Sequence, residues 1–275
     1  MRTRTKAQGS RRRKVEVVSC FAGVSQVEPI LEAGADALYC GLVRSSWHNT
    51  SIELSWDEIY AASKIIHGQE KKLYVAINRD LTTEEVDELL ERLPVLENGM
   101  LDGLILSDWG CIHAIRQRSG SFPIHLSANA GCMHDWDFKL AEELGVQRIV
   151  LPPAMTLKEM NAITSRYHFE WEAITYGMKC INEAGHCQCG LPVGEKSTQF
   201  ICSHPLGFSG GCMDDEVMYL PFGNQFSRGE EAQHLRDIGV NHWKIEGRAR
   251  GYSHIAQGTR TLRSLADIPY GGMLP

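Results

Sequence analysis

Five of the nine cysteines in this 275-residue chain lie between residues 180 and 212. A thiolate is a soft ligand, suited to zinc, copper(I) and iron–sulfur clusters. Structural zinc sites favour cysteine pairs separated by two to four residues, whereas the one tight pair here is Cys187-x-Cys189 and the other gaps are wider. The spacing therefore favours an iron–sulfur cluster and keeps zinc as the alternative.

The competing explanation is that these cysteines are free thiols in a surface loop. Several exposed thiols would invite oxidation without any gain in packing, so we rank this explanation below a metal site. The remaining cysteines lie at predicted strand ends or in predicted helices, where a thiol serves as a small hydrophobic group. They are Cys20, Cys40, Cys111 and Cys132.

A second group of residues that could do chemistry is polar and lies in or directly after predicted strands. The candidate catalytic residues are His125, Glu172, Lys244, Glu246 and Arg248. Alternation along a strand places Lys244 and Glu246 on the same side. Lys and Arg side chains can hold a carboxylated substrate through charge-assisted hydrogen bonds, and His125 can carry a proton. A structural ion pair is an equally good explanation for each residue taken alone.

The elements that must position these residues alternate along the chain between short strands and amphipathic helices. This alternation predicts a parallel sheet, and eight such units predict one closed (β/α)8 barrel of the TIM type, an α/β fold, over residues 15–265. The predicted strands are 15–19, 37–40, 72–77, 103–106, 124–127, 148–151, 169–174 and 243–246. The predicted helices are 24–33, 56–67, 82–96, 111–117, 136–144 and 157–165.

One long segment interrupts this pattern between the seventh and eighth predicted strands. It contains the Cys-rich loop 177–225, in which Gly and Pro are frequent and periodicity is weak. A structureless loop of this length inside a compact domain needs something else to order it, and a bound metal or cluster can do so. The loop leaves the carboxyl end of a barrel strand, where active sites of this fold lie.

Sequence motifs along most of the chain resemble those of the peptidase U-32 family, also called the collagenase-like peptidases. The family signature is matched in spacing by Glu172, Ile174, Gly177, Cys180, Gly185 and Cys187, with Met178 and Lys179 as departures from its usual residues. Three further segments are similar to family motifs: AGADALYCG at 33–41, HLSAN at 125–129 and KIEGR at 244–248.

The resemblance implies a barrel that, in several members, carries a [4Fe–4S] cluster on four cysteines. Those members act in oxygen-independent hydroxylation, some on ubiquinone precursors as paired subunits and others on bases of transfer or ribosomal RNA. Carried over to this chain, Cys180 and Cys187 are the first two ligands and Cys202 is near the third. Cys212 is expected as the fourth ligand, with Cys189 in reserve.

Charge is distributed unevenly and bears on the substrate. Residues 1–14 carry seven Lys or Arg and no acid, whereas the whole chain has a net charge of −6, so the remainder is clearly acidic. We expect the first fourteen residues to be a disordered basic tail. An acidic body should repel a phosphate backbone, which ranks RNA below a small aromatic or quinone-precursor substrate.

These observations lead to an expected enzyme and three alternatives. We expect an oxygen-independent, iron–sulfur-dependent hydroxylase, hence an oxidoreductase, acting alone or with a paralogous partner subunit. The alternatives are an RNA-base hydroxylation factor, a U-32-type peptidase, and a non-catalytic [4Fe–4S] subunit for electron transfer or assembly. The chain contains neither a long apolar run nor a secretory signal, so we expect no membrane span and a cytoplasmic protein.

Overall fold

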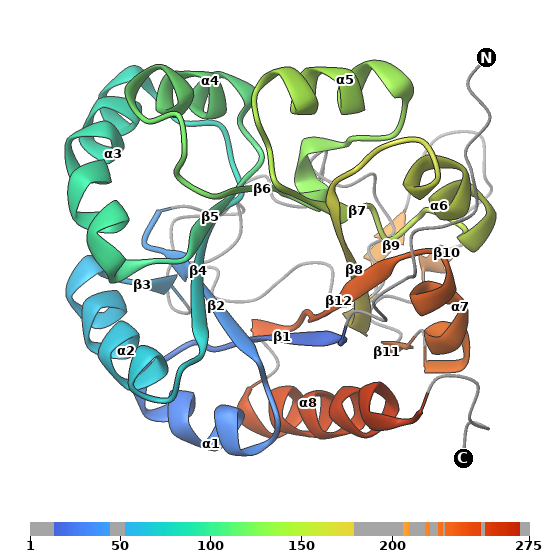
Figure 1. Cartoon of the computed structure of the whole chain (residues 1–275). Coiled ribbons are helices and arrows are strands. Elements are labelled where there is room, and N and C mark those ends of the chain that lie inside the picture. The colour runs from blue at the N-terminus through green and yellow to red at the C-terminus, as the bar shows by residue number, and fades with distance from the viewer. Residues whose placement is uncertain are drawn as a thin grey trace.

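The computed structural model describes residues 14–44, 53–178, 206–208, 218–220, 225–227, 229–248 and 251–269. Eight parallel strands form a closed barrel, because β1 pairs both with β2 and with β12 at the other end of the strand order (Figure 1). The barrel strands are β1 (Glu16–Cys20), β2 (Ala37–Leu42), β4 (Lys72–Ile77), β5 (Gly103–Leu106), β6 (Ile124–Leu126), β7 (Arg148–Leu151), β8 (Glu170–Met178) and β12 (Val240–Ile245). The predicted TIM-type barrel with an insertion before its last strand is confirmed.

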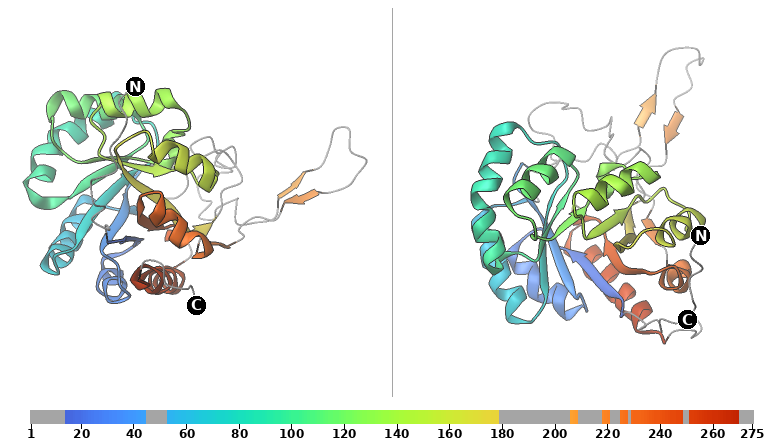
Figure 2. Two further views of the ribbon diagram at one scale, coloured as in Figure 1. Left: turned by 45° about the vertical axis from the view of Figure 1, so that its right-hand side comes forward. Right: turned by 45° about the horizontal axis from the view of Figure 1, so that its top comes forward.

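Helices surround the barrel on its outer side (Figures 1 and 2). They are η1 (Val24–Gln26), α1 (Val27–Glu32), α2 (Trp56–Gly68), α3 (Thr83–Val95), η3 (Leu96–Met100), α4 (Trp109–Arg118), η4 (Ala128–Ala130), α5 (Asp135–Glu143), α6 (Leu157–Thr164), η7 (Gly229–Glu231), α7 (Ala232–Asp237) and α8 (Tyr252–Asp267). In the described part of the chain, none of these helices has the length and apolar character that a membrane span requires.

Capping boxes fix the starts of two helices. At α2 the Ser55 hydroxyl accepts a hydrogen bond from the Glu58 backbone N–H at 3.4 Å, and the Glu58 carboxylate accepts one from the Ser55 N–H at 2.8 Å. Thr82 and Glu85 form the same reciprocal pair at α3. Both pairs satisfy backbone donors that the first turn of a helix leaves free, which fixes where each helix begins.

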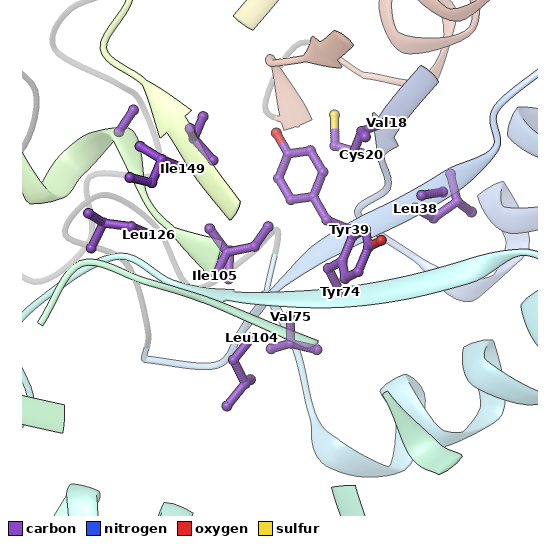
Figure 3. Packing of buried hydrophobic residues seen from close by; sticks show 14 of the residues in the cluster. Val18, Cys20, Leu38, Tyr39, Tyr74, Val75, Leu104, Ile105, Leu126 and Ile149 are labelled. Atoms are coloured by element: carbon purple, nitrogen blue, oxygen red, sulfur yellow. The ribbon is translucent and has the colours of Figure 1, made fainter. Parts of the chain in front are cut away.

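Alternation along the strands divides the buried residues into two sets. Figure 3 shows Tyr39 and Ile105 extending to one side of their strands, and Val75 and Leu104 to the other. The second set packs under the helices and is apolar, as expected for a sheet covered by helices. The four cysteines that the structure describes, Cys20, Cys40, Cys111 and Cys132, are buried and unpaired, as we expected.

The structure adds elements that the sequence pattern did not predict. They include helices α7 and α8 and the short strands β3 (Glu53–Leu54), β9 (Leu206–Phe208), β10 (Met218–Leu220) and β11 (Gln225–Ser227). Strands of two or three residues are too short to show periodicity. β8 is also longer than predicted, because its last residues pair antiparallel with β11, with Gln225 opposite Met178 and Ser227 opposite Tyr176.

Candidate functional site

The first residues of several barrel strands form a charged cluster inside the barrel. Arg148 begins β7 and is 1% exposed. Its guanidinium donates to Glu16 Oε1 at 3.0 Å, to Glu172 Oε2 at 3.0 Å and to Glu170 Oε2 at 2.8 Å. One buried cation is thus surrounded by three carboxylates, one from β1 and two from β8, so the cluster ties β1, β7 and β8 together.

Glu172, a candidate catalytic residue, lies between two cations. Its side chain is fully buried. Oε1 accepts from Lys244 Nζ at 2.8 Å, while Oε2 accepts from Arg148. Burial raises the pKa of Glu172, but the charges of Lys244 and Arg148 lower it by more than burial raises it. The pKa of Glu172 therefore lies below its ordinary value. The carboxylate therefore stays ionised and holds the Lys244 ammonium in place.

Glu16 closes the cluster on the side of the amino-terminal strand ends. Its Oε2 accepts from Lys72 Nζ at 2.7 Å, and its Oε1 lies 3.1 Å from His242 Nδ1. Burial raises the pKa of Glu16, but the hydrogen bond from His242 and the charge of Arg148 lower it more, leaving it well below the ordinary value. Glu16, Arg148, Glu170, Glu172 and His242 are called the Arg148 cluster below.

His125 lies in the barrel interior beside this cluster. It is 3% exposed, and its ring centroid lies 4.5 Å from that of Tyr74. Burial and the charges of Arg148 and Lys244 hold the pKa of His125 well below its ordinary value. Nδ1 is buried and has no hydrogen-bond partner among the residues that the structure describes. His125 is therefore a neutral imidazole at neutral pH, with one ring nitrogen free to accept or donate.

The opposite end of the barrel carries a second set of charges, packed around Tyr39. Lys244 Nζ lies 4.0 Å from the centroid of the Tyr39 ring, and the Arg248 guanidinium lies 5.8 Å from it. The Tyr39 hydroxyl donates to the Ile245 carbonyl at 3.0 Å, which fixes the ring against β12. A ring in this position attracts both cations through its negative face.

Glu246 directly follows β12 at the same end. Its backbone N–H donates to the Tyr176 carbonyl at 2.8 Å, and a Cβ added at Gly177 would lie 2.7 Å from the Glu246 carbonyl oxygen. Burial raises the pKa of Glu246 to about 7, against the lowering effect of Arg248 and Lys244. Its carboxyl group can therefore both release and accept a proton near neutral pH. Tyr39, Lys244, Glu246 and Arg248 are called the mouth set below.

The structure brings the candidate catalytic residues into one interior but divides them between its two ends. Lys244 pairs with Glu172 and not with Glu246, its neighbour on the same side of the strand. The sequence pattern did not predict a role for Arg148, Glu16 or Tyr39. A charged residue that begins an apolar strand was the available signal for Arg148 and Glu16, since such a side chain must find a buried partner. Nothing in the sequence distinguished Tyr39 from an ordinary core aromatic residue.

The predicted cluster ligands Cys180, Cys187, Cys202 and Cys212, and Cys189 in reserve, lie outside the described residues, so their assignment stays a prediction. The described part of the chain contains no group of three or more His, Cys, Asp or Glu side chains able to hold a metal ion. Burial raises the pKa of the Cys20 and Cys40 thiols to about 12, which disfavours thiolate ligation by either. A soft-metal site would therefore draw on the cysteines between residues 180 and 212.

The two ends of the Cys-rich segment lie together. β8 ends at Met178, two residues before Cys180, and β11 returns to pair with it. The segment thus leaves and rejoins the barrel at one place, the end at which Glu246 follows β12.

Comparisons with known proteins agree with this architecture. The family model described as peptidase family U32 matches residues 22–272. Two proteins named tRNA hydroxylation protein P are similar: that of Escherichia coli K12 is 28% identical over 63% of this chain and 39% of its own length, and that of Helicobacter pylori J99 is 25% identical over 95% and 66%. The 23S rRNA 5-hydroxycytidine C2501 synthase of Escherichia coli K12 is 24% identical over 92% of this chain and 39% of its own length. The chain thus spans between about two fifths and two thirds of the length of these relatives.

A solved structure has the same fold. The U32 peptidase Mk0906 aligns with a TM-score of 0.59 at 10% identity, covering 90% of this chain and 97% of its own. At this level of identity the likeness concerns the barrel alone and not its chemistry.

Proposed function

This chain belongs to peptidase family U32, and from this premise we propose that it is the barrel of an enzyme that hydroxylates bases in RNA. The observation that carries the proposal is the likeness to RNA hydroxylation proteins, which extends over 95% of this chain in one case and 92% in another. The chain spans only part of the length of those relatives, so the activity of the whole protein is itself part of this proposal.

The likeness favours RNA over the small aromatic substrate that the acidic body suggested. Net charge averages over the whole surface, whereas a nucleic acid is held by local groups of Lys and Arg. The first fourteen residues carry seven such side chains. The acidic balance of the remaining chain is therefore a weak argument against RNA, and the alternative from sequence analysis becomes the leading proposal.

We further propose that a [4Fe–4S] cluster is held by Cys180, Cys187, Cys202 and Cys212, with Cys189 as the reserve ligand and zinc as the alternative metal. The donor set fits, since these thiols are concentrated in one segment whose ends meet at the barrel end that carries the mouth set. Such a cluster supplies electron transfer without molecular oxygen.

The described residues suggest what the barrel itself contributes. The Glu172 carboxylate, buried between Lys244 and Arg148, keeps the Lys244 ammonium fixed below the mouth. Glu246 can hold or release a proton at its carboxyl group near neutral pH, as a general acid or base requires. Tyr39 and Arg248 give this end a rigid, positively charged lining.

The first test is the iron and acid-labile sulfide content of the anaerobically purified protein. We expect about four of each per chain, lost in Cys180→Ser and Cys187→Ser and retained in Cys20→Ser, whose thiol is buried in the barrel. Equal iron content in all three variants would remove the ligand assignment. A colourless zinc protein would remove the cluster and bring the peptidase alternative forward.

The second test concerns the substrate. Nucleosides from total RNA are compared by mass spectrometry between the parent strain, a strain lacking the gene and strains complemented with wild type or Cys180→Ser. We expect a nucleoside one oxygen atom heavier that disappears with the gene and returns only with wild type. An unchanged nucleoside profile would reject RNA as the substrate.

A further inference from the structure

Arg248 has a buried polar atom without a partner. Its Nη1 is buried from solvent, and within the described residues no acceptor lies at hydrogen-bond distance from it. The interior cations described above are satisfied differently: Arg148 donates to three carboxylates and Lys244 donates to Glu172. A buried charged donor left without an acceptor is costly, so its presence needs a reason.

The fold makes room for this guanidinium. A Cβ added at Gly41, in β2, would lie 2.1 Å from Arg248 Nη1, so the guanidinium occupies the space that a side chain would fill. Gly41 is not among the residues with positive φ, so glycine is not required there by the backbone. The Tyr39 ring supports the guanidinium from a second side. Two neighbouring features therefore hold Arg248 in place, although neither supplies a hydrogen-bond acceptor for Nη1.

Glu246 is the one acid in the mouth set. Within the mouth set, Lys244 is hydrogen-bonded to Glu172, and Glu246 is the acid whose charge acts on Arg248. With a pKa of about 7, Glu246 is only partly ionised at neutral pH. Glu246 therefore balances only part of the charge of Arg248.

We propose that Arg248, held by Gly41 and Tyr39, is the receptor for a carboxylate or phosphate group of a ligand that binds at the barrel mouth. The planar guanidinium presents donors in the geometry that such oxyanions accept, and an oxyanion would satisfy Nη1 and balance the rest of the Arg248 charge together. This inference deepens the proposed function, on which it rests for the idea that a substrate binds at this end. The oxyanion belongs either to a free small molecule or to the RNA itself.

The experiment is isothermal titration calorimetry on the full chain, purified anaerobically with its metal content, at constant ionic strength. The probes are malonate, inorganic phosphate and a single-stranded RNA oligonucleotide. We expect at least one probe to bind, and Arg248→Gln to weaken that binding by roughly thirtyfold or more, because a buried charge pair loses one partner. Arg248→Lys should restore only part of the affinity, since an ammonium lacks the guanidinium fork.

Gly41→Ala tests the same receptor without removing its charge. The added methyl group must displace Nη1, so we expect weaker binding in a protein that still folds, because the displaced atom is the end of a flexible side chain. Gly68→Ala is the matched control, as a Cβ there meets nothing within 4 Å. Binding should be unchanged in this variant.

The outcomes separate the source of the oxyanion and the two proposals. Arg248-dependent binding of malonate or phosphate identifies a free small ligand, and such binding of the oligonucleotide alone identifies an RNA phosphate. Absence of binding by wild type, or equal binding by wild type and Arg248→Gln, would overturn the inference. A changed reduction potential in Arg248→Gln with unchanged anion affinity would overturn it too, by assigning Arg248 to the metal site. If Arg248-dependent anion binding is found but the nucleoside profile is unchanged in the strain lacking the gene, the inference stands and the proposed function is rejected.

Discussion

The two ends of the barrel interior use the same residue types in different ways. At the amino-terminal ends of the strands, the guanidinium of Arg148 donates to three carboxylates, and Glu16 is also in contact with Lys72 and His242. At the carboxyl end, Arg248 retains a buried donor without a described acceptor. The first arrangement stabilises the closed barrel, while the second leaves interactions to be made by something that binds. This division agrees with the general separation of stability and activity between the two faces of such barrels.

Removing the carboxylate that joins the two ends should have the largest effect. Glu172→Ala leaves the buried cations Arg148 and Lys244 without their shared partner, and we expect a loss of about 3 to 5 kcal/mol in the free energy of unfolding. Urea denaturation measures this loss. Glu170→Ala is the control, because Glu170 is 44% exposed and water can replace part of what Arg148 loses. Similar losses in both variants would mean that burial does not separate the two carboxylates.

The two ends should respond to pH with opposite signs. The folded pKa of Glu16 lies below its unfolded value, so its contribution to stability is present above about pH 4.5 and is lost as the pH falls below that value. The folded pKa of Glu246 is raised from 4.5 to about 7, so its contribution is present below pH 4.5 and is lost as the pH rises toward 7.

The variants Glu16→Gln and Glu246→Gln test this opposition through unfolding free energies measured across that pH range. Glu16→Gln should reduce stability at neutral pH, by about 1 to 3 kcal/mol, and weaken the loss toward acid. Glu246→Gln should leave stability at neutral pH unchanged or raised, and remove the decline between pH 4.5 and 7. A decline toward neutral pH that persists in Glu246→Gln would assign it to another group.

The smallest effect is expected at Lys72, an exposed neighbour of the Arg148 cluster. Lys72 donates to Glu16 at 2.7 Å, but its side chain is 49% exposed. Lys72→Met should therefore change the unfolding free energy by no more than about 0.5 kcal/mol, since water solvates the lysine in both states. A loss approaching that of Glu172→Ala would show that the number of charge contacts, and not burial, sets the stability of this end.

Local signals predicted the elements that support the barrel. The strands Lys72–Ile77, Gly103–Leu106 and Arg148–Leu151 have the predicted bounds, because each is a short apolar run between turn residues. The capping pairs that begin at Ser55 and Thr82 are also local features, because each partner lies three residues away in the chain. β11 escaped prediction because its pairing with β8 joins residues far apart in sequence.

The candidate site was predicted in part. Glu172 and Lys244 were recognised as polar strand residues that could do chemistry, and they are hydrogen-bonded to one another. Their dependence on Arg148 was not recognised, because contacts between β7, β8 and β1 are set by the closure of the barrel and not by any local pattern. The role of Gly41 could not be predicted from the sequence either, since it depends on the path of the Arg248 side chain.

The antiparallel pairing of β11 with β8 has an evolutionary consequence. Met178 and Gln225 are held opposite one another by strand pairing. The segment between them is therefore attached to the barrel at the same two points, whatever its length. The entropic cost of closing such a segment rises by only about 0.6 kcal/mol for each doubling of its length. Insertions and deletions there are thus nearly neutral for the barrel, and selection can reshape the segment as an independent module while the strands beneath it stay unchanged.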